Sequence, residues 1–187
     1  MRKPPAEVVA SLLAATTVFI GLPPYNLPPW AIFISWAATF AIGGPTFGNM
    51  RKLWLTMPIG SIAACSIVIG FKWSGQFLIG GGAIAAQCVI LFCLNGLMMS
   101  LGRFRPINFV PGMFFGFATY FATLFGGFGP AAGNLLVALV ACITMNALGP
   151  IYAWLTANLS THHHQREAEP PAVDQRPVAP NGTVVSE

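Results

Sequence analysis

The chain is a series of long apolar runs separated by short stretches of proline, glycine and charge. Six runs stand out, at residues 6–23, 28–44, 53–71, 77–99, 108–128 and 130–156. A helix needs about 20 mostly apolar residues to cross the hydrocarbon core of a bilayer. The interiors of these runs are apolar on every side, which is typical of membrane helices rather than of amphipathic ones. The pattern predicts an all-α, polytopic membrane helix bundle with six transmembrane helices.

The two ends of the chain have a different character. We expect residues 1–7 to form a cytoplasmic N-terminus and residues 8–158 the transmembrane domain. Residues 159–187 are polar and rich in proline, so they predict a disordered cytoplasmic tail. The tail contains His162, His163 and His164, but no Cys or carboxylate at ligand spacing, so we interpret them as a solvated run without a metal. A cleaved signal peptide is disfavoured because no A-x-A-like site closes the first run.

Charge supports the membrane interpretation and gives an orientation. Only 7% of the residues are charged, whereas soluble domains carry about 25%. With six spans and a cytoplasmic N-terminus, Lys72 is the single basic residue outside, and the other eight of nine lie inside: Arg2, Lys3, Arg51, Lys52, Arg103, Arg105, Arg166 and Arg176. Cytoplasmic loops of membrane proteins are enriched in Lys and Arg. We therefore expect both termini to be cytoplasmic.

A short pattern near the start of the chain recurs in its second half. Pro24–Pro29 (PYNLPP) matches Pro106–Pro111 (PINFVP) as P-x-N-x-x-P. The first match has an offset of 82, and further matches follow at offsets of 83 to 85: Ala38-Thr39 with Ala122-Thr123, Gly43-Gly44 with Gly126-Gly127, Pro45 with Pro130, and Asn49 with Asn134. A repeated unit of three helices crosses the membrane in opposite senses, so the pattern predicts a 3+3 inverted-topology repeat. Chance is the alternative, because the chain holds 20 Gly and 16 Pro.

Prolines and glycines in these segments predict local structure. Pro28, Pro29 and Pro111 suit the first turn of a helix, where the amides lack partners. Asn26 and Asn108 precede them and are predicted to cap the free amides; the alternative is that they are ordinary turn residues. Three G-x-x-x-G pairs predict close helix packing: Gly44/Gly48, Gly112/Gly116 and Gly129/Gly133.

Two of the segments resemble a known family. LPPWAIFISWAATFAIGG (residues 27–44) and NFVPGMFFGFATYFA (residues 108–122) are similar to the YcdZ-like family of small bacterial inner-membrane proteins, a group defined by a domain of unknown function. The resemblance covers roughly residues 8–156. It implies a multi-spanning helical protein in the bacterial plasma (inner) membrane. It supplies no activity, substrate or catalytic residue.

The chemistry available inside the runs is sparse. Between Val8 and Thr161 there is no Asp, Glu or His. General acid–base catalysis, metal binding and proton relays all depend on such groups. The four cysteines, Cys65, Cys88, Cys93 and Cys142, lie in apolar runs without a base beside them. We therefore expect no enzyme, no catalytic residue, no cofactor, no metal and no proton coupling.

The remaining polar residues suit a passive path. A channel or facilitator needs a few neutral donors and acceptors in an otherwise apolar passage. The candidates are Asn26, Thr39, Asn49, Gln87, Asn95, Asn108, Thr123, Asn134 and Asn146. The prediction is a channel or facilitator for a small neutral or weakly polar solute. For each residue the alternative is that it only pairs with another polar group inside the bilayer.

Two other functions remain open at this point. A secondary transporter without proton coupling could use carbonyls and hydroxyls as sodium ligands. A non-transporting membrane assembly or adaptor subunit is also compatible with the sequence. The expected partners are the lipid bilayer and a small solute, and a homo-oligomer is allowed. Nucleic acid is not expected, because the basic residues are scattered between the apolar runs.

Overall fold

In a computed structural model, residues 3–161 are described, and they form six helices without a strand. Each predicted apolar run overlaps one helix, in the predicted order. The helices are α1 (Ala6–Ile20), α2 (Pro29–Ala41), α3 (Phe47–Ser74), α4 (Gly81–Leu101), α5 (Val110–Phe125) and α6 (Leu135–Leu159). The all-α prediction is therefore confirmed. The histidine run and nearly all of the predicted tail lie outside the described residues.

The helices divide into three long and three short ones. α3, α4 and α6 have 28, 21 and 25 residues, and these three are long and apolar enough to cross a membrane. α1, α2 and α5 have only 15, 13 and 16 residues. At a rise of about 1.5 Å per residue they are about 20–24 Å long, against a hydrocarbon core of about 30 Å.

Proline and glycine set the limits of the short helices. Pro28 directly precedes α2, and Gly43 and Gly44 follow it with φ of 107° and 90°. Gly126 ends α5, and Gly127 continues with φ of 71°. Positive φ does not continue a right-handed helix, and Gly adopts it readily. The helical parts of these runs are therefore shorter than the predicted spans.

α3 begins earlier than its predicted span. The Thr46 side chain accepts a hydrogen bond from the backbone N–H of Asn49 at 3.3 Å and caps the helix at Phe47. The predicted runs 28–44 and 53–71 place Arg51 and Lys52 in the loop between them, but both residues lie in the first turns of α3. That expectation was wrong because long basic side chains are compatible with a helix and can extend toward water from its end.

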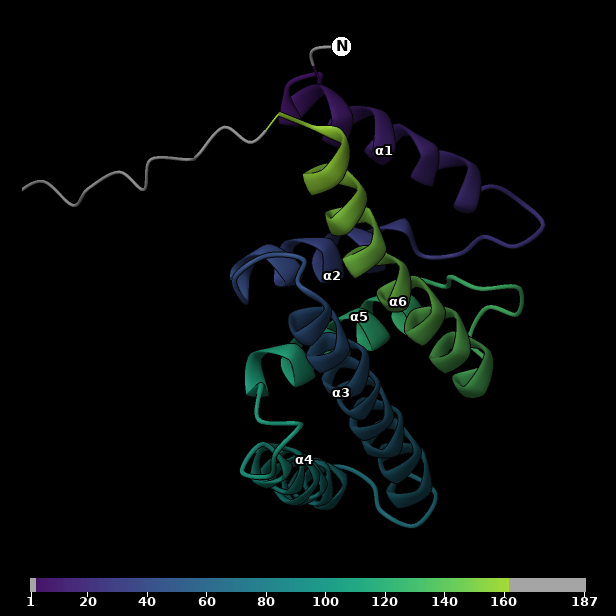
Figure 1. Ribbon diagram of the computed structural model, residues 1–187. Coiled ribbons are helices and arrows are strands. Elements are labelled where there is room, and N and C mark those ends of the chain that lie inside the picture. Colours follow the sequence, from purple (N-terminus) through teal and green to yellow (C-terminus); the bar gives the residue numbers. More distant parts are fainter. Residues whose placement is uncertain (1–2, 162–187) are drawn as a thin grey trace, which may run out of the picture.

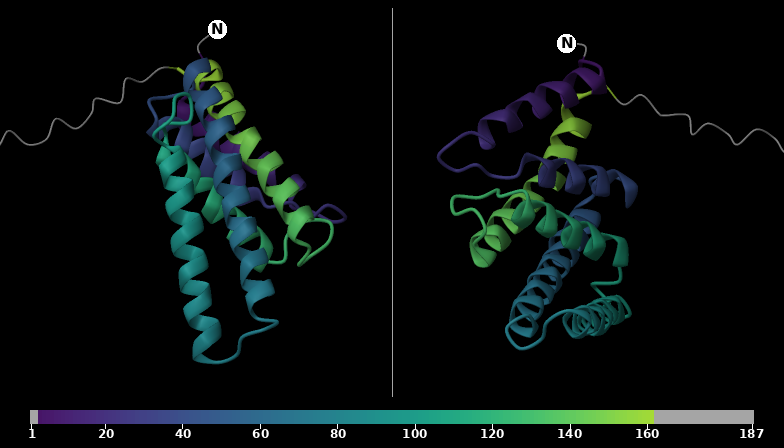
Figure 2. Two further views of the ribbon diagram at one scale, coloured as in Figure 1. Left: turned by 90° about the horizontal axis from the view of Figure 1, so that it is seen from below. Right: turned by 180° about the vertical axis from the view of Figure 1, so that it is seen from behind.

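The helices pair across the two halves of the chain (Figure 1). α3 packs most extensively on α5, and α2 packs most extensively on α6. α4 lies along α3 (Figure 2), and α1 contacts α6. α1, α2 and α3 can be matched in order with α4, α5 and α6. The α3–α5 pair then corresponds to the α6–α2 pair, and the α3–α4 pair corresponds to the α6–α1 pair. α3 and α6 contact each other at the centre of this arrangement.

Glycines allow the closest of these contacts. A Cβ on Gly60 of α3 would overlap the backbone of Met113 in α5, and one on Gly116 of α5 would overlap the backbone of Met57 in α3. A Cβ on Gly149 of α6 would overlap Ser35 and the backbone of Trp36 in α2. The α3–α5 and α2–α6 interfaces therefore require glycine where the backbones meet.

The prediction of packing by G-x-x-x-G pairs is confirmed for one pair of three. Gly112 and Gly116 both face α3, and a Cβ on Gly112 would overlap the Thr56 hydroxyl. In the other two pairs, Gly44, Gly129 and Gly133 lie in turns with φ of 90°, 105° and 77°, and Gly48 lies in the first turn of α3. Packing was the wrong role for those two pairs, because the three glycines with positive φ serve the turns and a Cβ on Gly48 would meet no neighbour.

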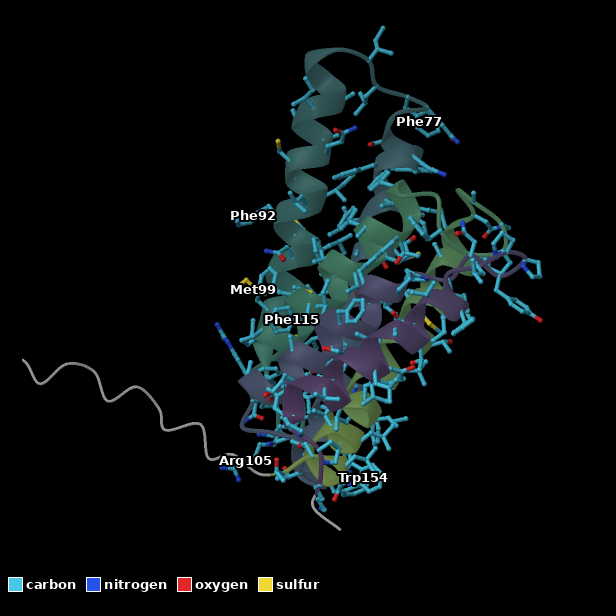
Figure 3. All side chains as sticks on the ribbon, turned by 90° about the horizontal axis from the view of Figure 1, so that it is seen from above. Phe77, Phe92, Met99, Arg105, Phe115 and Trp154 are labelled. Carbon is cyan, nitrogen blue, oxygen red and sulfur yellow. The ribbon has the colours of Figure 1, made fainter. Side chains whose placement is uncertain are left out.

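The two ends of the described chain lie together. The Thr161 N–H donates to the Pro4 carbonyl at 2.9 Å, and the Lys3 Nζ donates to the Asn158 carbonyl at 2.7 Å. Arg105 and Trp154 lie at this same end of the molecule, and Phe77 lies at the opposite end (Figure 3). The start of α1 and the end of α6 are thus on one side.

Candidate functional site

Four polar side chains meet where α3, α5 and α6 come together. They form what we call the polar cluster: Ser61, Thr119, Cys142 and Asn146. The first three are fully buried or nearly so, and Asn146 is 2% exposed. The Asn146 Nδ2 donates to the Thr119 Oγ1 at 2.8 Å, and the Cys142 thiol donates to the same hydroxyl at 3.1 Å. The cluster carries no formal charge.

Local helical geometry positions each member of the polar cluster. Cys142 and Asn146 are four residues apart, so they share one face of α6. Ser61 directly follows Gly60 in α3, and its hydroxyl donates to the Gly116 carbonyl of α5 at 2.9 Å. That interhelical hydrogen bond is possible because the glycine contacts bring the α3 and α5 backbones together.

One acceptor in the polar cluster has no partner. The Thr119 hydroxyl donates its proton to the Gly116 carbonyl at 3.0 Å, so it can only accept from Asn146. The amide nitrogen of Asn146 must therefore face Thr119, and the Oδ1 atom is left buried without a hydrogen bond. A buried unpaired acceptor costs about 1–3 kcal/mol. Such an atom calls for an explanation, and a ligand or a water is the usual one.

Asn146 also lines a cavity between α3 and α6. The α3–α6 cavity has a volume of about 270 Å³ and is lined by Leu53, Trp54, Met57, Pro58, Ile143, Asn146, Ala147 and Ile151. Most of this lining is apolar. The Trp54 indole N–H donates to the Ala147 carbonyl at 3.0 Å, so it is already used.

Two prolines release further acceptors at the α3–α6 cavity. Pro58 lies inside α3 and Pro150 inside α6. Proline has no N–H, so neither residue can donate to the carbonyl four positions earlier. Those carbonyls belong to Trp54 and Asn146, and both residues line the cavity. Two residues that line the cavity thus carry three acceptors: the Asn146 Oδ1 and the backbone carbonyls of Trp54 and Asn146. Neither carbonyl receives the regular helical hydrogen bond.

The structure brings few of the sequence-predicted path residues together. Asn146 is in the polar cluster, and Thr123 adjoins it by donating to the Thr119 carbonyl at 2.7 Å. Thr39 is fully buried in α2 and donates to the Ser35 carbonyl at 2.8 Å. Gln87 is half-buried on α4, where the Asn95 amide contacts the Met99 sulfur at 3.8 Å.

The other four candidates lie at helix ends and in turns. Asn49 donates to the Gly44 carbonyl at 3.0 Å. Asn134 caps α6 and accepts from two backbone N–H groups, at 3.1 and 3.2 Å. Asn108 is exposed before α5. Asn26 has φ of 44°, and its carbonyl accepts from the Gly129 N–H at 2.8 Å.

The prediction that Asn26 and Asn108 cap α2 and α5 is wrong. The residues before these helices are Pro28 and Phe109, and neither helix has a side-chain cap. Pro29 and Pro111 in the first turns already remove one amide each, which reduces the need for a cap. Asn26 instead joins the α1–α2 loop to the α5–α6 loop, with its Nδ2 at 3.4 Å from the Gly127 carbonyl.

Sequence reasoning missed Ser61, Thr119 and Cys142 as companions of Asn146. It also missed the interior prolines. Pro58 and Pro150 were visible as prolines inside otherwise apolar runs, and each such proline releases a carbonyl. No sequence signal places Ser61 beside Gly116, because that contact depends on how α3 and α5 pack.

The fold is that of a helical protein with three helices suited to a membrane. The family described as "Protein of unknown function (DUF1097)" matches residues 7–161, and the chain belongs to that family. The prediction of an uncharacterised family is thus confirmed, whereas the more specific resemblance to YcdZ-like proteins stays a prediction. Comparisons with curated proteins and with solved structures found no match.

Proposed function

We propose that this protein is a multi-pass protein of the bacterial inner membrane that lets a small neutral or weakly polar solute cross passively. The observation that carries the proposal is the polar cluster with its unpartnered Asn146 oxygen, next to the apolar α3–α6 cavity. A facilitator of neutral solutes needs a few uncharged hydrogen-bonding groups in apolar surroundings. The site has that composition.

The proposed topology has six crossings with both termini in the cytoplasm. Contact between the segments before α1 and after α6 supports an even number of crossings. The short helices α1, α2 and α5 would cross together with the irregular segments that adjoin them. Irregular backbone at membrane depth is tolerated where protein covers it, and Pro28 and Gly129 are buried in this way.

The inverted repeat belongs to the same proposal. Support comes from the helix pairing, which keeps its pattern when the two halves are exchanged. The loops agree with it. Asn26 before α2 bonds to Gly129 after α5. Phe109 before α5 and Ile42 after α2 pack against one buried cluster, which consists of Ala38, Leu53 and Met57. In transporters with such repeats the solute site lies between the halves. The α3–α6 cavity lies between the third helices of both halves.

Passive passage fits the chemistry better than coupled transport or catalysis. Proton relays through membranes run on Asp, Glu or His, and the chain has none between Val8 and Thr161. The same composition leaves no acid–base pair for an enzyme, so we propose none. A sodium-coupled transporter remains the second candidate, because carbonyls released by prolines are sodium ligands of the kind found in broken helices.

The test is solute flux in proteoliposomes. Stopped-flow light scattering would compare the wild type, Asn146→Leu and empty vesicles against urea, formamide and glycerol. The wild type is expected to raise the permeability for at least one solute, and Asn146→Leu to lower that increase. Asn158→Leu is the matched control, because it makes the same change at an exposed position of α6 that does not line the cavity. Permeability equal to that of empty vesicles for every solute would reject a facilitator.

An adaptor function predicts a different result when the C-terminal segment is removed. If the protein acts by binding a partner through its C-terminal segment, removal of residues 162–187 abolishes the cellular phenotype. A facilitator formed by residues 3–161 keeps its flux after that deletion. Flux of the truncated protein in the same vesicles therefore separates the two functions.

A further inference from the structure

We infer that the α3–α6 cavity binds small neutral solutes that donate hydrogen bonds through N–H groups, such as simple amides and urea. Its relevance to transport rests on the proposed function, but binding itself does not. The inference names a chemical class of ligand and assigns Asn146 as the residue that selects it.

The first argument is the balance of donors and acceptors around the cavity. The side-chain donors are already used: the Trp54 indole N–H on the Ala147 carbonyl, and the Asn146 amide nitrogen on the Thr119 hydroxyl and the Cys142 sulfur. What remains are acceptors, namely the Asn146 Oδ1 and the carbonyls that Pro58 and Pro150 release. A site with acceptors alone complements a ligand with donors, and it discriminates strongly against an analogue without them.

The second argument concerns charge. A cation also seeks oxygen ligands, but the cavity has no carboxylate, and Glu7 is the single acid between residues 3 and 161. It lies exposed in the first turn of α1. A desolvated ion without a counter-charge is strongly disfavoured in apolar surroundings. The lining therefore favours a neutral donor.

The third argument concerns size and access. A volume of about 270 Å³ lies just below the range of about 300–1,000 Å³ typical of drug-sized ligands. A primary amide offers two N–H donors on one nitrogen, so one small molecule can serve two acceptors. The Oδ1 atom is covered in the structure, so the ligand must displace a side chain. Met57 lines the cavity and is unbranched, which makes it the side chain best able to move.

The experiment measures binding directly, by saturation-transfer NMR on the full chain in nanodiscs. The probes are acetamide and N,N-dimethylacetamide, which share the carbonyl but differ in N–H donors. We expect the wild type to bind acetamide at least tenfold more tightly than its dimethyl analogue. Asn146→Leu should weaken acetamide about tenfold and leave the dimethyl analogue unchanged. Asn158→Leu, at an exposed position of α6 outside the cavity lining, should change neither affinity.

A second variant covers the case in which Asn146→Leu does not fold. Pro150→Ala places a backbone N–H opposite the Asn146 carbonyl and so occupies one acceptor, while Ala favours the helix. It should weaken acetamide several-fold. A retained helical circular dichroism spectrum and a single gel-filtration peak show that each variant is folded.

The outcomes separate this inference from the proposed function. Equal affinity for the two amides, or acetamide binding that neither variant changes, would overturn the inference even if solutes still cross. Selective acetamide binding that Asn146→Leu abolishes, in vesicles that pass no solute, would support the inference and reject the facilitator.

Discussion

Gly60 and Gly96 both lie inside helices, but only Gly60 faces the backbone of another helix. A Cβ built on Gly60 would lie 2.6 Å from the carbonyl carbon of Met113 and 2.9 Å from the amide nitrogen of Phe117. Both atoms belong to the α5 backbone, which cannot move aside as a flexible side chain can. Gly96 of α4 has open space around the same position. The two sites therefore allow a matched pair of Gly→Ala substitutions.

The magnitudes follow from two opposing terms. Overpacking costs about 1–3 kcal/mol, and contact with two residues of the α5 backbone places Gly60→Ala near the upper end. Replacing Gly by Ala inside a helix stabilises the helix by about 0.8–1 kcal/mol. We expect a net loss of about 2 kcal/mol of unfolding free energy for Gly60→Ala. For Gly96→Ala we expect no loss and up to about 1 kcal/mol of gain.

The assay is reversible unfolding in mixed detergent micelles, followed by circular dichroism. Gly60 directly precedes Ser61, whose hydroxyl donates to the Gly116 carbonyl. Separation of α3 from α5 therefore also disturbs the polar cluster, and solute flux should fall in the fraction that stays folded. Unfolding curves of Gly60→Ala and Gly96→Ala that coincide with the wild type would refute the close α3–α5 contact.

Three further predictions concern topology, coupling and the loops. Reporter fusions after Ser160 should report the cytoplasm and fusions at Lys72 the outside, because eight of nine basic residues then lie inside; the opposite pattern contradicts the six-span topology. Flux should be insensitive to a protonophore at constant sodium, since the described chain has no buried acid or His; a collapse of uptake would contradict the passive mechanism. Asn26→Leu should lower the free energy of unfolding by about 1 kcal/mol or more, because Asn26 has a positive φ and contacts Gly127. Asn108→Leu lies in an exposed loop and should change that free energy by less than about 0.5 kcal/mol. Thermal unfolding compares the two variants, and equal losses would count against the loop assignment.

The sequence by itself determined the helical class and the order of the six helices. Apolar runs must satisfy their backbone groups internally, and a helix does this within one segment. Proline marked the starts of α2 and α5 as expected, because it acts through local backbone geometry. The glycines with positive φ ended both helices earlier than the predicted spans. The sequence does not predict the start of α3, because Arg51 and Lys52 interrupt the apolar pattern, whereas charge alone does not end a helix.

Only the tertiary structure decided which polar residues meet. Ser61, Thr119 and Asn146 are separated by 58 and 27 positions in the chain, and their contact depends on the register of three packed helices. That register is set where Gly60 and Gly116 let α3 and α5 approach, a property of two surfaces rather than of either segment. The unpartnered Asn146 oxygen is likewise visible only after every neighbouring donor has been placed, because hydrogen bonding inside the bundle is decided by packing across helices.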